Sequence, residues 1–278
     1  MKKLLLIFAH PDDESFTCGG TIAKYYKNGW KIDLLVATRG EAGQTGSYGK
    51  ISIDKIADIR QAEQQKAAKI LGISTVTFFD YPDGNLSNVN PGELEAVLYN
   101  EMLEMSPDIV ITFEPRGISN HPDHMKISRA TTNTYYRYAK DLLYPKKRGS
   151  RDPDGYKEAF KQNIPISEVK DTIPKLYQVC TSKHAVNYLK KHNIIPNESY
   201  DKPREGIPDK HITTVIDITR FASKKKKALQ SHISQLADIE KHTSFSTHPM
   251  FQHEYFILRY YGIQEVYMGR NDSVSNRL

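Results

Sequence analysis

The sequence predicts an α/β fold of the Rossmann-like kind, with a mainly parallel sheet and helices on both of its faces. The first observation is a series of short, mostly apolar runs, at residues 4–9, 32–37, 75–79 and 109–113. Runs that lack a polar–apolar alternation are typical of strands buried on both faces. The second observation is that segments with helical spacing separate these runs, which favours parallel strands joined by helices. The third is that polar motifs follow two of the runs, where α/β proteins place their chemistry.

The elements of the first half follow in order. Strands are predicted at 4–9, 31–38, 75–79 and 108–113, and helices at 22–27, 54–71, 93–105 and 125–143. The first helix is expected to begin after Gly19-Gly20, and the second is the clearest because its apolar residues repeat at helical spacing up to Gly72. The glycine-rich residues 40–46 are expected to form a flexible active-site loop.

The second half is less regular. Strands are predicted at 176–180 and 213–218, and a helix at 220–241. Residues 144–174 and 183–210 are polar and rich in proline, so we interpret them as lid-like insertions, since long excursions from compact domains are usually lids or disordered. No internal repeat or clear linker divides the chain. We therefore expect one domain over 1–278.

Composition excludes several classes of protein. The chain has 278 residues, 38% of them hydrophobic and 26% charged, as in ordinary globular proteins. The net charge of +6 is concentrated in Lys146-Lys147-Arg148 and Lys224–Lys227, which we interpret as solvated segments because no nucleic-acid motif accompanies them. Two cysteines favour a reducing cytoplasm. No apolar run reaches the roughly 18 residues of a membrane span. The composition is compatible with a homo-oligomer.

Two short clusters carry the candidate chemistry. They are His10-Pro11-Asp12-Asp13-Glu14, which follows the first strand, and His121-Pro122-Asp123-His124, which follows the fourth. Catalytic zinc typically takes three protein ligands and leaves a position for water. His10 and Asp13 can reach one ion from a single tight loop, and His124 would complete the set. Because neighbouring side chains diverge, Asp12 is better placed as a general base facing the bound water.

The other members of the second cluster have candidate roles as well. His121 can stabilise an oxyanion or protonate a leaving group. Asp123 would orient the imidazole of His121 or of His124 and tune its basicity. The alternative for either cluster alone is a helix cap, in which the aspartates accept hydrogen bonds from backbone amides. Two such clusters, each after a buried strand, favour the metal site.

These residues resemble the LmbE-like, or PIG-L type, zinc N-deacetylases. The first motif is similar to Ala9–Glu14 and the second to Gly117–His124. Three further segments match. Within the predicted helix over 54–71, Arg60–Glu63, Ala67-Ala68 and Leu71-Gly72 resemble the helix that carries the family's substrate-contacting arginine. The turn Tyr81-Pro82-Asp83-Gly84 also matches, and Ala228–Gln235 resembles the family's His-x-Ser-Gln helix. The resemblance covers roughly positions 4 to 240, and the joint occurrence of these motifs is specific.

The resemblance implies a role for each matching residue. Zinc would lie on His10, Asp13 and His124, one ion per chain, with Asp12 as general base and His121, tuned by Asp123, at the oxyanion. Arg60 and Asp83 would hold hydroxyl groups of a sugar-like substrate. The loop that contains Glu41 is a further candidate for substrate contact, with a plain connector as the alternative. Iron or another divalent ion stays open, since such ligands hold several metals.

The expected function is therefore a cytoplasmic, zinc-dependent hydrolase that removes the N-acetyl group from an N-acetylglucosamine-type conjugate. One alternative is an amidase that cleaves a larger acyl group from a thiol–sugar conjugate. Another is a non-catalytic metal- or sugar-binding protein, against which the presence of a base argues. A nucleotide-binding Rossmann protein is disfavoured, because the G-x-G-x-x-G spacing is absent and the acidic loop would repel a pyrophosphate. The expected partner is a small amino-sugar conjugate, not a nucleic acid or a membrane.

Overall fold

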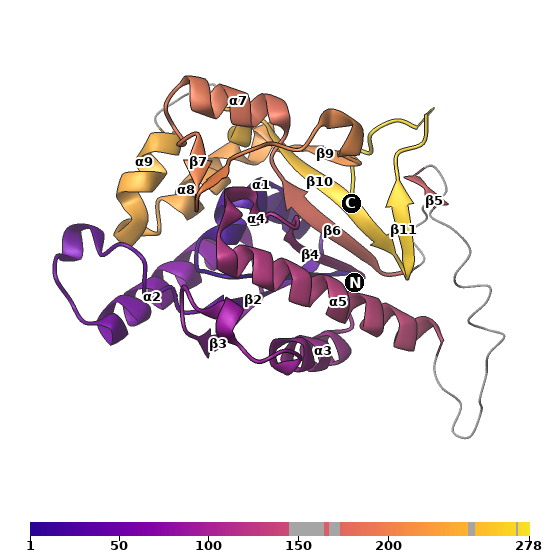
Figure 1. The fold of residues 1–278 in the computed structure, drawn as a ribbon, viewed down its shortest axis with the longest axis horizontal. Helices are drawn as coiled ribbons and strands as arrows, with labels where there is room; N and C mark the ends of the chain where they lie inside the picture. The colour runs from indigo at the N-terminus through magenta and orange to yellow at the C-terminus, as the bar shows by residue number, and fades with distance from the viewer. Residues whose placement is uncertain (145–163, 167–172, 244–247, 271) are drawn as a thin grey trace.

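A mixed, mostly parallel sheet forms the centre of the structure (Figure 1). The computed structural model describes residues 1–144, 164–166, 173–243, 248–270 and 272–278. Five strands are parallel, in the order β3 (Thr75–Tyr81), β2 (Lys31–Thr38), β1 (Lys3–Phe8), β4 (Ile109–Phe113) and β6 (Lys175–Cys180). The sheet continues through β10 (His253–Tyr261), antiparallel to β6, to β11 (Gln264–Tyr267) and β5 (Ile164–Pro165), while β9 (Thr214–Asp217) pairs with β10. The predicted α/β class is confirmed.

Helices cover both faces of this sheet. One group comprises α1 (Asp13–Lys27), α2 (Ile53–Leu71) and α8 (Ala222–Leu229), which contact one another, and α1 also contacts β1, β2 and β6. The other comprises α3 (Glu93–Met105) and α5 (Pro122–Leu143), which pack together, with α5 against β1 and β4. Figure 1 shows α5 in front of the central strands and α1 behind them.

The central strands are buried on both faces, as their lack of alternation predicts. Each residue of β4 and β6 is buried, as is each of β1 and β2 after its first lysine. Phe8 and Phe113 pack edge to face across β1 and β4, with ring centroids 4.9 Å apart. Burial of this apolar surface supplies most of the free energy that fixes the sheet, and with it the loops at its carboxyl edge.

The first helix starts earlier than predicted, at Asp13 instead of residue 22. Gly19 and Gly20 do not precede the helix, as the prediction had it, but lie inside it, where they allow close packing. A Cβ on Gly20 would lie 2.6 Å from the side chain of Ile218. Cys18 is buried and has non-helical backbone angles, so the helix is kinked there. The earlier start places Asp13 in the first helical turn.

The predicted helix over 220–241 is also wrong in part, because it is interrupted. It consists of α8 and α9 (Leu236–Thr243), with a 3-10 turn over Ile233–Gln235 between them. Ser234 donates hydrogen bonds from N and Oγ to the carboxylate of Glu63 on α2, at 2.8 and 2.7 Å. These bonds replace the helical bonds that would have continued the ladder. Strands β10 and β11 were not predicted, although the burial of β10 largely alternates.

Residues 183–210 contain more structure than the predicted insertion implied. They form α7 (Lys183–Lys191), capped by Ser182, and a small hairpin of β7 (Glu198–Ser199) and β8 (Lys202–Pro203). Most of the predicted insertion over 144–174, together with Lys146–Arg148, lies outside the described residues. Within the described ranges, no helix is both long and apolar enough to cross a membrane.

The lysine run on α8 corrects one expectation about charge. Lys224, Lys226 and Lys227 are exposed, as predicted, but Lys225 is buried. Its Nζ donates to Oε1 of Glu254 on β10 at 2.6 Å. The partner lies too far along the chain for a local charge pattern to indicate it.

Candidate metal centre and active site

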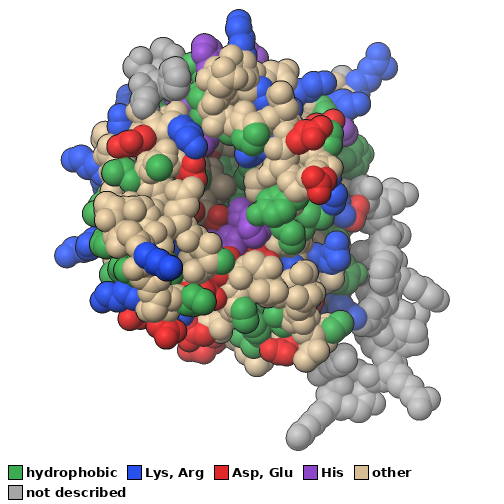
Figure 2. All heavy atoms as spheres, turned by 60° about the vertical axis from the view of Figure 1, so that its left-hand side comes forward, with side chains coloured by type: hydrophobic (Ala, Val, Ile, Leu, Met, Phe, Trp, Pro, Cys, Tyr) green, Lys and Arg blue, Asp and Glu red, His purple; other side chains and the backbone are tan. Residues whose placement is uncertain are grey.

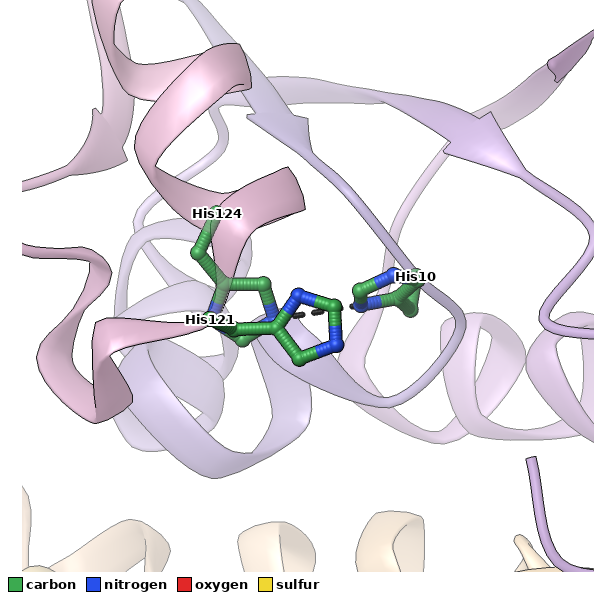
Figure 3. Close-up of side chains that lie close together, drawn as sticks. All are labelled: His10, His121 and His124. Atoms are coloured by element: carbon green, nitrogen blue, oxygen red, sulfur yellow. Dashed lines mark hydrogen bonds between the residues drawn. The ribbon is translucent and has the colours of Figure 1, made fainter. Parts of the chain in front are cut away.

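The two polar clusters meet at the carboxyl edge of adjacent parallel strands. His10 follows β1, while His121 and His124 lie at the start of α5, after β4 and the short helix α4 (Gly117–Asn120). Because β1 pairs with β4, their exits are neighbours. Figure 3 shows the three imidazoles gathered between the two loops. The predicted convergence of the clusters is confirmed.

His10, His124 and Asp13 form the tightest group. His10 Nδ1 lies 3.1 Å from His124 Nε2 (Figure 3). The Asp13 carboxylate reaches both rings, with Oδ1 3.3 Å from His124 Nε2 and Oδ2 3.7 Å from His10 Nδ1. Asp13 Oδ2 also accepts a hydrogen bond from the amide of His10 at 2.8 Å, which holds the loop closed.

His124 is oriented by its other nitrogen and by packing. Its Nδ1 lies 3.0 Å from the carbonyl oxygen of Gly117, and its ring stacks on Phe113 with centroids 4.2 Å apart. Gly117 has a φ of +63°, and a Cβ there would lie 2.4 Å from the Cβ of His124. Glycine is therefore required for this close approach. Since Nδ1 donates to a carbonyl, Nε2 presents a lone pair to His10.

His10 is held by carboxylates on its far side. Its Nε2 lies 2.9 Å from Oδ1 of Asp83 and 3.2 Å from Oδ2 of Asp123. Burial lowers the pKa of His10, but these two carboxylates outweigh it and raise the pKa to about 10. Asp123 also accepts from the amides of Gly84 and Leu86, at 2.7 and 3.0 Å. Its carboxylate thus orients His10, instead of His121 or His124 as the sequence suggested.

This hydrogen bonding tests whether the residues fit a metal ion. Nε2 of His10 donates to carboxylates and Nδ1 of His124 donates to a carbonyl, so the two nitrogens that face each other need one shared proton or cation. Two imidazole nitrogens and one carboxylate are a ligand set for a divalent metal. The described residues include two possible metal-binding groups, one of His10, His121 and His124 and one of His10, Asp83 and Asp123. We favour a metal position next to Nδ1 of His10, which faces His124, because Nε2 of His10 already donates to the carboxylates of Asp83 and Asp123.

Asp12 is separated from this group and held by Arg60. Its backbone has a φ of 92°, in the left-handed region. Arg60 Nη2 donates to Asp12 Oδ2 at 2.9 Å, and its two terminal nitrogens also donate to the carbonyls of Gly40 and Pro11, both at 2.8 Å. Burial raises the pKa of Asp12 to about 7 against the opposing charge of Arg60. A carboxyl with this pKa can exchange a proton near neutral pH.

His121 presents a donor nitrogen to the site. Its Nδ1 accepts a hydrogen bond from the amide of Asp123 at 3.2 Å, so its single proton lies on Nε2. Burial, together with the nearby His124 and His10, lowers the pKa of His121 to about 4. The imidazole is therefore neutral at physiological pH and can donate from Nε2.

Two residues that the sequence did not single out support His121. The ring of Tyr200, in the hairpin of β7 and β8, packs edge-on against His121 with centroids 5.0 Å apart. The side-chain amide of Asn120 donates to the carbonyls of Pro203, Lys202 and Ser199, at 3.2, 3.4 and 3.5 Å. Asn120 directly precedes His121, so its place in the motif was the only available signal.

The remaining predicted residues lie in the loops around His10. Glu41 Oε1 accepts from the amide of Asp83 at 2.8 Å, and Asp83 Oδ2 accepts from the amide of Ala42 at 3.0 Å. The pKa of Asp83 is lowered to about 2, since the bond to His10 outweighs burial. Arg60, Asp83 and Glu41 thus brace the site from one side. Gln64, which the sequence did not single out, accepts from the amide of Asp12 at 2.9 Å.

A cavity of about 520 Å³ opens from this centre. Its lining includes Asp12, Asp13 and His124, together with Arg204, His242 and His248. Figure 2 shows a hollow in the molecular surface with histidine and acidic side chains at its floor. A space of this size is typical of small-molecule sites.

Fold and site together define an α/β protein with a candidate divalent-metal centre and an adjacent buried carboxylate, Asp12. The family model "PIG-L: GlcNAc-PI de-N-acetylase" matches residues 5–135. The chain is 30% identical to the "Probable N-acetyl-alpha-D-glucosaminyl L-malate deacetylase 2" of Bacillus anthracis, over 74% of this chain and 90% of the relative. It is 28% identical to the "1D-myo-inositol 2-acetamido-2-deoxy-alpha-D-glucopyranoside deacetylase" of Kineococcus radiotolerans, over 84% of this chain and 69% of the relative. The chain belongs to the PIG-L family, and the deacetylase class of hydrolase that its motifs predicted is confirmed.

Solved structures support the fold. The 4-carboxy-2-hydroxymuconate hydratase GalB of Pseudomonas putida matches with a TM-score of 0.62 and 19% identity, over 98% of this chain and 100% of that one. The N,N'-diacetylchitobiose deacetylase of Pyrococcus horikoshii matches with a TM-score of 0.61 and 20% identity, over 92% of this chain and 82% of that one. Because a hydratase and a deacetylase share this fold, the fold alone does not identify a substrate.

Proposed function

We propose that this chain removes the N-acetyl group from an N-acetylglucosaminyl conjugate, with a single Zn²⁺ held by His10, Asp13 and His124. The observation that carries the proposal is that the carboxylate of Asp12 lines the same cavity as Asp13 and His124, next to two imidazole nitrogens that face each other at 3.1 Å and share a proton or a cation. The two curated relatives described above, named for malate and inositol conjugates, supply the substrate class.

A divalent ion in this site would supply a Lewis acid that lowers the pKa of a water molecule towards neutrality. Asp12 is placed to take the proton of the attacking water and to return it to the departing amine. Arg60 fixes the Asp12 carboxylate through the 2.9 Å hydrogen bond, so Asp12 keeps its orientation through both proton transfers.

His121 is proposed to stabilise the tetrahedral adduct of the substrate. A neutral imidazole with its proton on Nε2 can donate to an oxyanion as negative charge develops there. The amide of Asp123 fixes that tautomer, and Tyr200 packs against the ring. Asp123 itself would act through His10. Arg60, Asp83 and Glu41 lie on the side of the site where the sugar hydroxyls would bind.

A second candidate is an amidase that removes a larger acyl group. The cavity that starts at Asp12, Asp13 and His124 favours it, because about 520 Å³ far exceeds what one methyl group fills. The two candidates share the site and the mechanism. They differ in the group that occupies the cavity.

The experiment is acetate release by Zn²⁺-loaded protein from N-acetylglucosamine and from its malate and inositol glycosides, with Asp12→Asn as the control. We expect release by the wild type alone, at a rate that ranks the conjugates. If the metal is bound and none of the three substrates is cleaved, while longer N-acyl glucosamines are, the second candidate replaces the first. Equal release by Asp12→Asn would remove Asp12 from its role.

A further inference from the structure

Three consecutive backbone amides in the loop after β4 all donate to one residue, Glu114. The amide of Gly117 donates to the carbonyl oxygen of Glu114 at 2.8 Å. The amides of Arg116 and Ile118 donate to Oε2 and Oε1 of the Glu114 carboxylate, at 2.8 and 2.7 Å. Glu114 is 3% exposed, and its own amide donates to the carbonyl of Val179 on β6 at 3.0 Å. A single residue anchored to the sheet therefore holds the whole loop.

This arrangement requires a carboxylate at position 114. Both oxygens of the Glu114 side chain accept from an amide, and a glutamine would offer one acceptor oxygen and one donor NH2 group in their place. A buried carboxylate is costly unless hydrogen bonds and opposite charge compensate it. Two bonds from the loop itself do so here, with Nε of Arg116 3.9 Å from Oε2. The carboxylate and the loop thus stabilise each other.

The loop that Glu114 holds is strained. Ile118 has a φ of 62° and a ψ of −45°, near the γ-turn conformation with positive φ, which is rare and costly for a β-branched residue. Gly117 and Asn120 also have positive φ, of 63° and 62°, but glycine and asparagine tolerate it. A strained residue persists only where the surrounding structure holds it in place. The bonds from Glu114 to the amides of Arg116 and Ile118 provide that restraint.

The strained turn directs the carbonyl of Gly117 to one of the proposed metal ligands. Its oxygen lies 3.0 Å from Nδ1 of His124. Oγ of Ser119 lies 3.5 Å from the same nitrogen, so the carbonyl is the closer partner. An acceptor at Nδ1 orients an imidazole that binds a metal through Nε2, and it raises the basicity of that nitrogen. Glu114 therefore reaches His124 through the backbone of Gly117.

We propose that Glu114 is a positioning residue for the metal centre, because it keeps the carbonyl of Gly117 on Nδ1 of His124 and thereby keeps Nε2 directed at the ion. The inference rests on the metal ligands proposed above and adds a residue that sets their affinity. The sequence did not single out Glu114, which lies outside both histidine–aspartate clusters. Without its two side-chain bonds, the strained turn relaxes and the imidazole loses its partner.

The test is the Zn²⁺ dissociation constant of the full chain, measured by competition with a chromophoric chelator after circular dichroism shows that the metal-free protein is folded. Glu114→Gln has the same shape but keeps only one acceptor oxygen. We expect its Kd to rise about tenfold or more, as is typical when the support of a metal-binding histidine is lost. Glu205→Gln is the matched control. It removes an exposed carboxylate that binds the Arg116 side chain of the same loop at 3.0 Å, and we expect an unchanged Kd.

The visible absorption spectrum of the Co²⁺-loaded protein gives a second readout, which a general loss of stability would not change. This spectrum reports the ligands and the geometry around the ion. We expect shifted bands for Glu114→Gln and the wild-type spectrum for Glu205→Gln. If Glu114→Gln does not fold, Glu114→Asp replaces it in both measurements, because it keeps the charge but is one methylene too short to reach both amides.

The inference is overturned if folded Glu114→Gln binds Zn²⁺ as tightly as the wild type, or if Glu205→Gln weakens binding equally. His124→Ala separates this result from the ligand assignment. If His124→Ala binds Zn²⁺ like the wild type, the ligand set and this inference fail together. If His124→Ala loses the ion and Glu114→Gln does not, only this inference fails. Weaker binding by Glu114→Gln, with no hydrolysis of any substrate by the wild type, would refute the deacetylase function alone.

Discussion

Arg60 Nη2 donates to Asp12 Oδ2 at 2.9 Å, and both side chains lie largely inside the protein, with exposed fractions of 5% and 15%. This pair joins helix α2 to the loop after β1. It gives the carboxylate of Asp12 a fixed orientation. The predictions below follow from this arrangement and from the buried groups that surround it.

Replacing Arg60 by methionine should lower kcat about tenfold or more while the metal content stays unchanged. The side chain keeps its length but loses the bonds to Asp12, Gly40 and Pro11, so the base is no longer held in place. The matched control is Arg39→Met, because Arg39 pairs with Asp58 and Gln61 outside the site. Wild-type turnover in Arg60→Met, measured with metal analysis of the same sample, would refute the positioning role.

Removing one partner of the buried pair Lys225–Glu254 should destabilise the fold strongly. Both side chains are 1% exposed, so Lys225→Met leaves a buried carboxylate without its counter-charge, with hydrogen bonds from the amides of Gly20 and Thr21 alone. We expect a loss of about 3 to 5 kcal/mol in the free energy of unfolding, measured in urea. The double variant with Glu254→Gln should lose less than the sum of the two single variants. Additive losses would show that the pair is not coupled. Lys224→Met, on the exposed face of α8, is the control.

His232 should make the protein less stable in mild acid. It is fully buried, neither ring nitrogen has a partner, and burial together with the charge of Arg60 lowers its pKa to about 3. The pKa is about 6.5 in the unfolded chain. As the pH falls below 6.5, the unfolded state binds a proton that the folded state refuses, so stability is full above this pH and falls below it.

The test compares urea unfolding of the wild type with that of His232→Leu at about pH 7.5 and about pH 5.5. The fall in unfolding free energy should be about 1.4 kcal/mol smaller in the variant. His242 and His248, whose pKa values burial also lowers, contribute equally to both proteins and cancel. The same pH dependence in both proteins would show that His232 is not neutral in the fold.

Asn120 should affect catalytic efficiency because its side chain holds the hairpin of β7 and β8 in place. Its backbone has a φ of 62°, which asparagine and glycine tolerate, and its amide binds three carbonyls of residues 199–203. Asn120→Gly keeps the backbone conformation and removes the amide, so we expect a several-fold loss of kcat/KM as Tyr200 loses its place over His121. Proteolysis within 198–203 should accelerate. If neither rate changes in Asn120→Gly, the hairpin does not depend on Asn120.

Much of the site was predictable because its signals are local. His10 and Asp13 share one loop, His121 and His124 share one helical turn, and each loop follows a continuous apolar strand. The orientation of Asp123 towards His10 was not predictable, since it depends on how two loops from different strands meet. The burial of Lys225 was not predictable for the same reason, because its partner Glu254 lies on a strand that the local sequence does not relate to it.

The central claim is that His10, Asp13 and His124 bind the metal and that Asp12 acts beside it. The most direct test is the metal content and the turnover of wild type, Asp12→Asn and His124→Ala, measured on the same preparations after loading with Zn²⁺ and removal of excess ion. We predict about one ion per chain in wild type and in Asp12→Asn, little in His124→Ala, and turnover in wild type alone. Full metal content in His124→Ala, or wild-type turnover in Asp12→Asn, would contradict the account.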